Sequence, residues 1–181
     1  MNILFAGSPK SSARILECLF KKDDISVVGA ITQPDKRSGR GKNLIESDVS
    51  INANVLGIRT FKPENLNTQE IKDEISSLEI DFLVVIAYGK IIPNWLLKLP
   101  KISPINIHFS LLPKYRGASP IQSSLMNVDT VTGFSFIQII DEKLTLVEKK
   151  SDYKVLRKKE SSSKEEGKTI EKSDDPIRMY L

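Results

Sequence analysis

The 181-residue sequence contains one cysteine, one histidine and no long apolar run. The lone Cys18 excludes an intrachain disulfide and argues against a cysteine-based zinc site, so we expect no metal. Because Cys18 lies on the apolar side of a predicted helix, we interpret it as a buried thiol and not a nucleophile. No run approaches the roughly 20 apolar residues that a membrane helix needs, and residues 1–5 carry no basic leader. We therefore expect a cytoplasmic protein without membrane contact.

The overall composition is that of a single globular domain. Hydrophobic residues make up 40% and charged residues 28% of the chain, which is close to ordinary usage for one domain of this length. From Glu148 onward, charges of both signs and a run of three serines replace the regular apolar spacing. Such a segment buries too little apolar surface to offset its ordering entropy. The sequence thus predicts a domain over 1–147 and a charged, disordered tail over 148–181.

Short β-branched runs alternate with helix-like segments along the first 140 residues. This alternation predicts an α/β fold, a Rossmann-like and mostly parallel sheet with helices on both faces. The expected strands are 3–6, 25–31, 82–87, 105–108 and 133–140, and the expected later helices are 48–56, 68–77, 93–98 and 120–126. Ligands of such sheets bind beyond the carboxyl ends of the strands. The residues of interest therefore follow Ala6, Ile31, Ala87 and Ile107.

The turn after the first strand contains a single glycine, Gly7, followed by Ser8 and Pro9. A dinucleotide-binding turn needs three glycines so that the backbone can approach a pyrophosphate, and this turn does not supply them. We interpret Ser8 as the N-cap of the next helix and Pro9 as part of its first turn. Nucleotide binding at this turn is not favoured.

A basic, glycine-containing loop follows the second strand. It spans residues 32–42 and carries four cations, Lys36, Arg37, Arg40 and Lys42. Such a loop could contact nucleic-acid phosphates, although basic loops are more often simply solvated. The net charge of +4 permits a polyanion partner without demanding one.

The residues best suited to chemistry are Asn106 and His108 in the expected strand 105–108. Residues two apart in a strand point to the same side, so the amide and the imidazole can face one crevice. A neutral imidazole can take up a proton near neutral pH, and an amide N–H can stabilise a developing oxyanion. Taken alone, a histidine at a strand end is more often a structural residue, but the pairing with Asn106 and the position at the edge of the sheet balance the two interpretations, so both stay open at this point.

Around these two residues, the stretches 106–108, 110–113 and 115–118 resemble the signature of enzymes that use 10-formyltetrahydrofolate. Three further stretches, 3–9, 32–42 and 85–93, are similar to the N-terminal domain of the methionyl-tRNA formyltransferase family. The resemblance covers about residues 1–144. It implies transfer of a formyl group from 10-formyltetrahydrofolate to the amino group of methionine on initiator tRNA, in translation initiation.

The resemblance also assigns roles to particular residues. Asn106 would hold the oxyanion and His108 would move protons, while the basic loop with Lys36, Arg37, Arg40 and Lys42 would contact the tRNA. The implied folate-binding residues are Ser110, Leu111, Leu112, Pro113, Tyr88 and Gly89. The implied partners are folate and initiator methionyl-tRNA, and we expect a monomer.

One part of the family signature is missing from this chain. The family has a catalytic aspartate in a Leu-Asp-x-Gly turn, and its position falls here at Leu144 or Thr145. Asp141 lies about four residues too early, roughly 13 Å along an extended chain. Loss of an orienting acid can reduce turnover by orders of magnitude. Glu46 and Asp48 add acids next to the basic loop where the family has prolines.

Three functional hypotheses remain after the sequence has been considered. The chain is a methionyl-tRNA formyltransferase with weakened chemistry, a non-catalytic folate-binding remnant, or a folate-dependent formyltransferase for another amine such as a sugar nucleotide. The loop at 33–42 argues against the third, and the missing acid favours the second.

Overall fold

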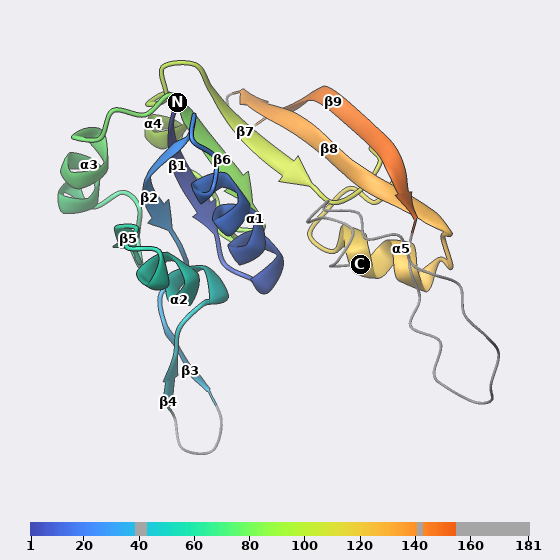
Figure 1. Ribbon diagram of the computed structural model, residues 1–181, viewed down its shortest axis with the longest axis horizontal. Coiled ribbons are helices and arrows are strands. Elements are labelled where there is room, and N and C mark those ends of the chain that lie inside the picture. The colour runs from blue at the N-terminus through green and yellow to red at the C-terminus, as the bar shows by residue number, and fades with distance from the viewer. Residues whose placement is uncertain (39–42, 141–142, 155–181) are drawn as a thin grey trace.

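The computed structural model describes residues 1–38, 43–140 and 143–154, the last of these segments by its backbone. The main sheet has seven strands in the order β5-β2-β1-β6-β7-β8-β9 (Figure 1). The strands are β1 (Asn2–Gly7), β2 (Ser26–Ile31), β5 (Thr60–Phe61), β6 (Phe82–Ile86), β7 (Ser103–His108), β8 (Val131–Ile140) and β9 (Lys143–Lys154). The first five are parallel, whereas β8 and β9 are antiparallel to their neighbours. The expected Rossmann-like, mostly parallel sheet is confirmed.

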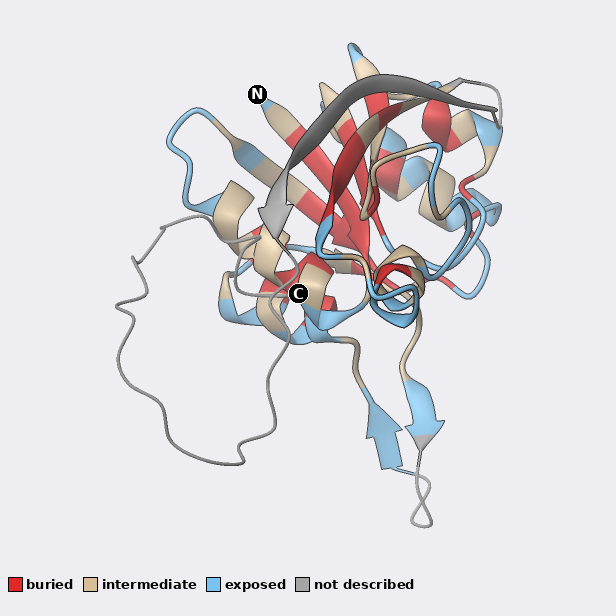
Figure 2. Cartoon of the chain, turned by 90° about the vertical axis from the view of Figure 1, so that its right-hand side faces the viewer, coloured by how far each residue is buried: buried red, intermediate tan, exposed pale blue. Residues whose placement is uncertain are grey.

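Helices cover both faces of this sheet, as the sequence predicts. They are α1 (Lys10–Phe20), α2 (Asp48–Val55), α3 (Gln69–Ser76), α4 (Asn94–Leu97) and α5 (Pro120–Met126). Successive side chains of β1 point to opposite faces of the sheet. Ile3 and Phe5 lie on the face covered by α1 and α2, and Leu4 lies on the face covered by α3 and α4. The strands at the centre are buried accordingly (Figure 2).

Two short strands form a separate hairpin that the sequence did not predict. β3 (Lys36–Ser38) pairs antiparallel with β4 (Asn43–Ile45) and extends away from the sheet as an exposed ribbon (Figures 1 and 2). The basic loop expected over 32–42 is thus partly a β-hairpin, because backbone pairing across the turn supplies hydrogen bonds that side-chain polarity does not reveal. Arg40 and Lys42 lie outside the described residues.

The N-terminus of α1 differs by one residue from the expectation. The N-cap is Pro9, without a side-chain capping hydrogen bond. The Ser8 hydroxyl instead donates to the main-chain oxygen of Tyr88, at 3.3 Å. Ser8 therefore connects two strand ends and does not cap the helix. Gly7 is needed for close packing, since a Cβ there would meet the Ile86 carbonyl oxygen at 2.8 Å.

The boundary that we expected after Val147 falls inside β9. The backbone of residues 143–154 pairs with β8, with Glu148 opposite Phe136 and Lys154 opposite Val131. The reason is that β8 offers an unpaired edge, and backbone pairing needs no apolar side chains. The rest of the expected tail, residues 155–181, lies outside the described residues.

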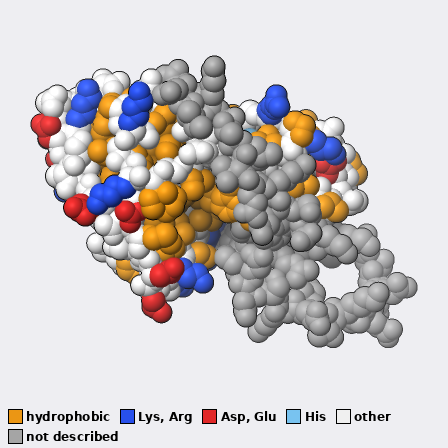
Figure 3. All heavy atoms as spheres, turned by 90° about the horizontal axis from the view of Figure 1, so that it is seen from above, with side chains coloured by type: hydrophobic (Ala, Val, Ile, Leu, Met, Phe, Trp, Pro, Cys, Tyr) orange, Lys and Arg blue, Asp and Glu red, His pale blue; other side chains and the backbone are white. Residues whose placement is uncertain are grey.

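Some apolar side chains are at the surface (Figure 3). Around the end of α5, Leu125, Met126, Val128 and Val131 are between 40% and 83% exposed. Among the helices of the described residues, none is long and apolar enough to cross a bilayer.

Candidate functional site

Asn106 and His108 lie in β7 at the edge of the sheet where the parallel strands end. Across β8, Asn106 is opposite Ile137 and His108 is opposite Ser135. Paired residues and residues two apart share one side of a sheet, so all four belong to the same side. On the other neighbour, Asn106 is opposite Val85 of β6. The structure thus places the amide and the imidazole on one side, as the spacing predicted.

The loop after β7 folds over this same side. Ser135 holds it there, since the Ser135 hydroxyl donates to the Ser110 carbonyl at 2.8 Å and accepts from the Leu112 N–H at 3.2 Å. Ser110 is fully buried and its hydroxyl donates to the Lys114 carbonyl at 2.7 Å. Several backbone groups of the loop assigned to the folate are therefore already bonded within the protein. Sequence reasoning missed Ser135, which lies in the apolar alternation of β8.

The imidazole of His108 has a defined partner. Its Nε2 lies 2.9 Å from the main-chain oxygen of Tyr115. A carbonyl can only accept, so Nε2 carries the proton, and in the neutral ring the lone pair is on Nδ1. A backbone carbonyl can orient the ring, but unlike a carboxylate it brings no full negative charge to stabilise the imidazolium.

The positions where the resemblance places the missing aspartate are far from His108. In β9, Leu144 is opposite Ile139 and Thr145 is opposite Gln138, whereas His108 is opposite Ser135. Thr145 therefore lies two strand spacings, about 10 Å, from β7. Along the strand direction it is also displaced from His108 by about three residues, which adds about 10 Å. The backbone register therefore places both positions away from His108. Asp141 lies outside the described residues.

A hollow of about 430 Å³ lies beside the carboxyl ends of β1, β2 and β6. The strand order reverses between β1 and β6, because the chain runs from β1 to β2 and β5 on one side and from β6 to β7 on the other. Such a switch point is the usual ligand position in these sheets. Two carboxylates and one lysine are among its lining residues, which are Ser8, Pro9, Gln33, Pro34, Lys36, Ile45, Glu46, Ser47, Asp48 and Ala87. Two strand spacings, about 10 Å, separate the β1 end of this hollow from Asn106.

The loops around this hollow are tied together by main-chain contacts that the sequence did not reveal. The carbonyl of Tyr88 accepts from the Gln33 amide at 2.8 Å and from Ser8. Gly89 has a φ of 78°, and a Cβ there would clash with the Gln33 amide. The Tyr88 ring is buried, and burial raises the pKa of its hydroxyl to about 12. Its hydroxyl therefore lies in the core and not in the crevice.

Lys62 holds the base of the β3–β4 hairpin. Its ammonium group contacts Asp35 at 2.9 Å and Glu46 at 2.8 Å, and Glu46 also accepts from the Ser50 hydroxyl at 2.6 Å. The bonds from Lys62 and Ser50 lower the pKa of Glu46. Desolvation acts to lower the pKa of Lys62, but the two carboxylates outweigh it and raise that pKa. Two acids near the basic hairpin are thus paired with a cation.

The described cations of the hairpin, Lys36 and Arg37, are exposed on β3. Lys36 helps to line the hollow, and Arg37 is the next residue on β3. The structure therefore places one residue of the predicted tRNA-contacting set, Lys36, at the hollow.

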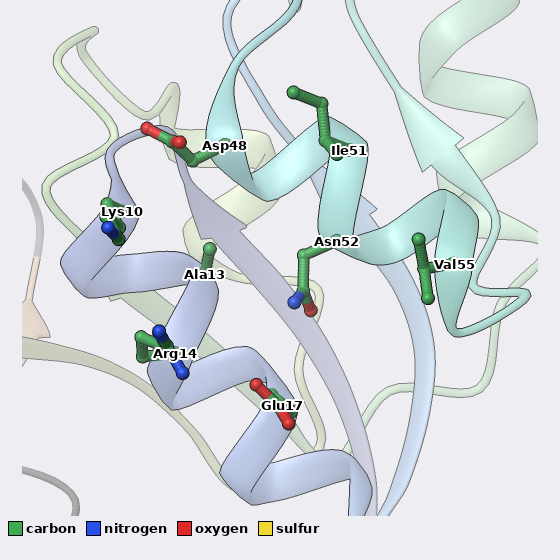
Figure 4. Close-up of a pocket in the computed structure, with 8 residues that line it drawn as sticks. All are labelled: Lys10, Ala13, Arg14, Glu17, Asp48, Ile51, Asn52 and Val55. Atoms are coloured by element: carbon green, nitrogen blue, oxygen red, sulfur yellow. The ribbon is translucent and has the colours of Figure 1, made fainter.

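A second hollow, of about 300 Å³, lies between α1 and α2 (Figure 4). It is lined by Lys10, Ala13, Arg14, Glu17, Asp48, Ile51, Asn52 and Val55. None of these was a predicted site residue.

Cys18 of α1 is partly buried, and burial, followed by the nearby Glu17, raises the pKa of its thiol. A thiol with a raised pKa is a poor nucleophile.

The fold is that of an α/β protein with a mostly parallel sheet, a class in which ligands bind at the carboxyl edge of the sheet. Comparison with known families places the chain more closely. Residues 1–145 match the family of formyl transferases, and the chain belongs to that family.

Solved structures agree on the fold. The chain is 19% identical to phosphoribosylglycinamide formyltransferase from Bacillus halodurans, with a TM-score of 0.62 over 90% of this chain and 83% of that one. For glycinamide ribonucleotide transformylase 1 from Geobacillus kaustophilus the values are 20%, 0.62, 86% and 82%. For a sugar N-formyltransferase from Shewanella sp. FDAARGOS_354 they are 18%, 0.54, 83% and 56%.

Proposed function

We propose that this chain takes a formyl group from 10-formyltetrahydrofolate and transfers it to an amine, and that this amine is the methionine carried on initiator tRNA. The observation that carries the proposal is the placement of Asn106 and His108 on one side of β7, at the strand-end edge, with the 110–117 loop on that same side. Family membership supports formyl transfer as the reaction class.

The reaction needs one hydrogen-bond donor to the developing oxyanion and one proton acceptor. The amine nitrogen attacks the formyl carbon, and a C–N bond forms while the bond from that carbon to the folate nitrogen breaks. The Asn106 amide donates to the oxygen that becomes negative. Nδ1 of His108 takes the proton from the attacking amine and returns it to the leaving folate nitrogen. Both groups lie on the same side, so one bound carbonyl can meet both.

The folate would bind against the loop of residues 110–113 and the segment at Tyr88 and Gly89. The residues present fit this in part. Leu111 and Leu112 are half-buried and offer apolar surface to an aromatic ring, whereas the space beside Gly89 is taken by the Gln33 amide. The Leu112 N–H and the Ser110 carbonyl are engaged by Ser135, so polar recognition falls to other backbone groups of the loop.

The hollow favours an amine on a large polyanion over a small phosphorylated amine. Glu46 and Asp48 line it, and although Lys62 pairs with Glu46, this acidic lining disfavours a phosphate bound inside. The exposed Lys36 lines the hollow, Arg37 follows on β3, and these cations suit phosphates of a nucleic acid that stays outside. This charge distribution supports tRNA over a ribonucleotide or a sugar nucleotide.

The rate of formyl transfer that we expect depends on the family aspartate, which Leu144 or Thr145 replaces in this sequence. Within the described residues the partner of the imidazole is a carbonyl, which brings no full negative charge, so we expect transfer to be slow. A chain that binds folate without transferring formyl is the alternative function, and the same observation favours it.

The test compares three amines with one donor. Purified chain is incubated with 10-formyltetrahydrofolate and initiator methionyl-tRNA, glycinamide ribonucleotide or an amino-sugar nucleotide, and the formylated product is quantified. We expect slow transfer to the tRNA alone, abolished in Asn106→Ala and His108→Ala. Transfer only to a small amine would overturn the tRNA assignment. Folate binding by calorimetry without any transfer would establish the alternative, and no binding at millimolar folate would overturn both.

A further inference from the structure

Tyr115 adopts a backbone conformation that non-glycine residues rarely take. Its φ is 55°, in the left-handed region. Among the described residues, Ala87 and Val128 are the other non-glycine residues with positive φ. Such conformations cost free energy and persist where surrounding contacts hold them, often at functional sites. For Tyr115 the consequence of this conformation is visible, because its carbonyl accepts the hydrogen bond from His108.

The side chain of Tyr115 is anchored by Asp129. The Tyr115 hydroxyl donates to Oδ2 of Asp129 at 2.6 Å. This bond, with some burial and the negative charge of Asp129, raises the pKa of the Tyr115 hydroxyl, so the phenol remains a donor at physiological pH. A charge-assisted hydrogen bond of this length fixes the ring, and the ring in turn restricts the rotation of its own backbone.

Asp129 is itself held by the end of α5. The N–H of Asp129 donates to the Ser124 carbonyl at 3.0 Å, and the N–H of Val128 donates to the Leu125 carbonyl at 3.1 Å. With Val128 at a φ of 60°, this is the Schellman arrangement that ends a helix. The helix end therefore sets the position of the Asp129 carboxylate.

We propose that Asp129 is a positioning residue for His108. Asp129 fixes the Tyr115 side chain, and the Tyr115 carbonyl then holds the His108 ring in the tautomer with the proton on Nε2 and the lone pair on Nδ1. In this chain the pair replaces the ring orientation that an adjacent acid would give. The proposal rests on the proposed function in taking His108 as the proton acceptor, but the tautomer itself is a property of the free protein.

The chain offers an unusually clean measurement, because His108 is its one histidine. Histidine labelled with ¹⁵N gives the signals of a single imidazole, and the protonated and unprotonated ring nitrogens resonate far apart. For the full chain, without folate or amine, we expect two separate signals with the proton coupled to Nε2. In Tyr115→Phe and Asp129→Asn we expect loss of that separation, as the ring exchanges between tautomers.

Asp23→Asn removes the same charge from an exposed residue at the other end of the fold and should leave both signals unchanged. Circular dichroism checks that each variant folds. Tyr115→Phe keeps the ring and the backbone, so it carries the test should Asp129→Asn not fold. Unchanged signals in folded Tyr115→Phe, or a wild-type ring with its proton on Nδ1, would overturn the proposal. Failure of formyl transfer with an intact tautomer effect would overturn the proposed function alone.

Discussion

The end of α5 offers a test of how much strain the fold carries. Val128 occupies the left-handed position after the helix, where glycine is the usual residue, and its φ is 60°. A non-glycine residue there costs roughly 1–2 kcal/mol, and a β-branched one lies at the upper end. The Val128→Gly variant removes this cost without changing the hydrogen bonds of the helix end.

The net gain can be worked out from the exposure of the side chain. Val128 is 60% exposed, so losing its side chain forfeits about 0.5 kcal/mol of apolar burial. Glycine also makes the unfolded chain more flexible, which costs about 0.5 kcal/mol. Subtracted from a relief of about 2 kcal/mol, these terms leave a gain of about 1 kcal/mol. For a chain of this length that corresponds to a rise in Tm of about 2–4 °C.

The assay is thermal unfolding of the wild type, Val128→Gly and a matched control, Val55→Gly. Val55 is 80% exposed and ends the helix α2. Glycine there should lower stability by about 0.5 kcal/mol, because helical positions disfavour glycine. An unchanged or lower Tm in Val128→Gly would refute the strain argument.

Three further outcomes are expected. Thr145→Asp should leave formyl transfer unchanged, because its place in β9 is too far from the imidazole of His108; a tenfold gain in kcat would contradict the register. The pKa of Glu46 is lowered from its ordinary value of 4.5, so its contribution to stability is present above that pH and lost as pH falls through its folded pKa. Denaturation at a series of pH values should therefore show the deficit of Glu46→Gln shrinking below 4.5, and a constant deficit would contradict the pairing with Lys62. Lys36→Ala should weaken tRNA binding and reduce the slope of log affinity against log salt by about one, as measured by filter binding, whereas Lys22→Ala should change neither.

The sequence by itself determined the framework of the site. Alternation of β-branched runs and amphipathic segments depends on near neighbours, and it predicted the five main strands and the helices on both faces. The period of two in a strand was enough to place Asn106 and His108 on one side of β7. The formyl transferase family was likewise recognisable from short local motifs.

Only the tertiary structure decided what those two side chains contact. The hydrogen bond between Tyr115 and Asp129 joins residues 14 apart, and the one between Ser135 and the Ser110 carbonyl joins residues 25 apart. The register of β9, which moves Thr145 away from His108, follows from pairing along β8 that no local pattern encodes. Periodicity shows which side of a strand a residue faces, but the path of a loop and the register of a partner strand depend on distant residues. For that reason the anchors of the site emerged only when the chain was folded.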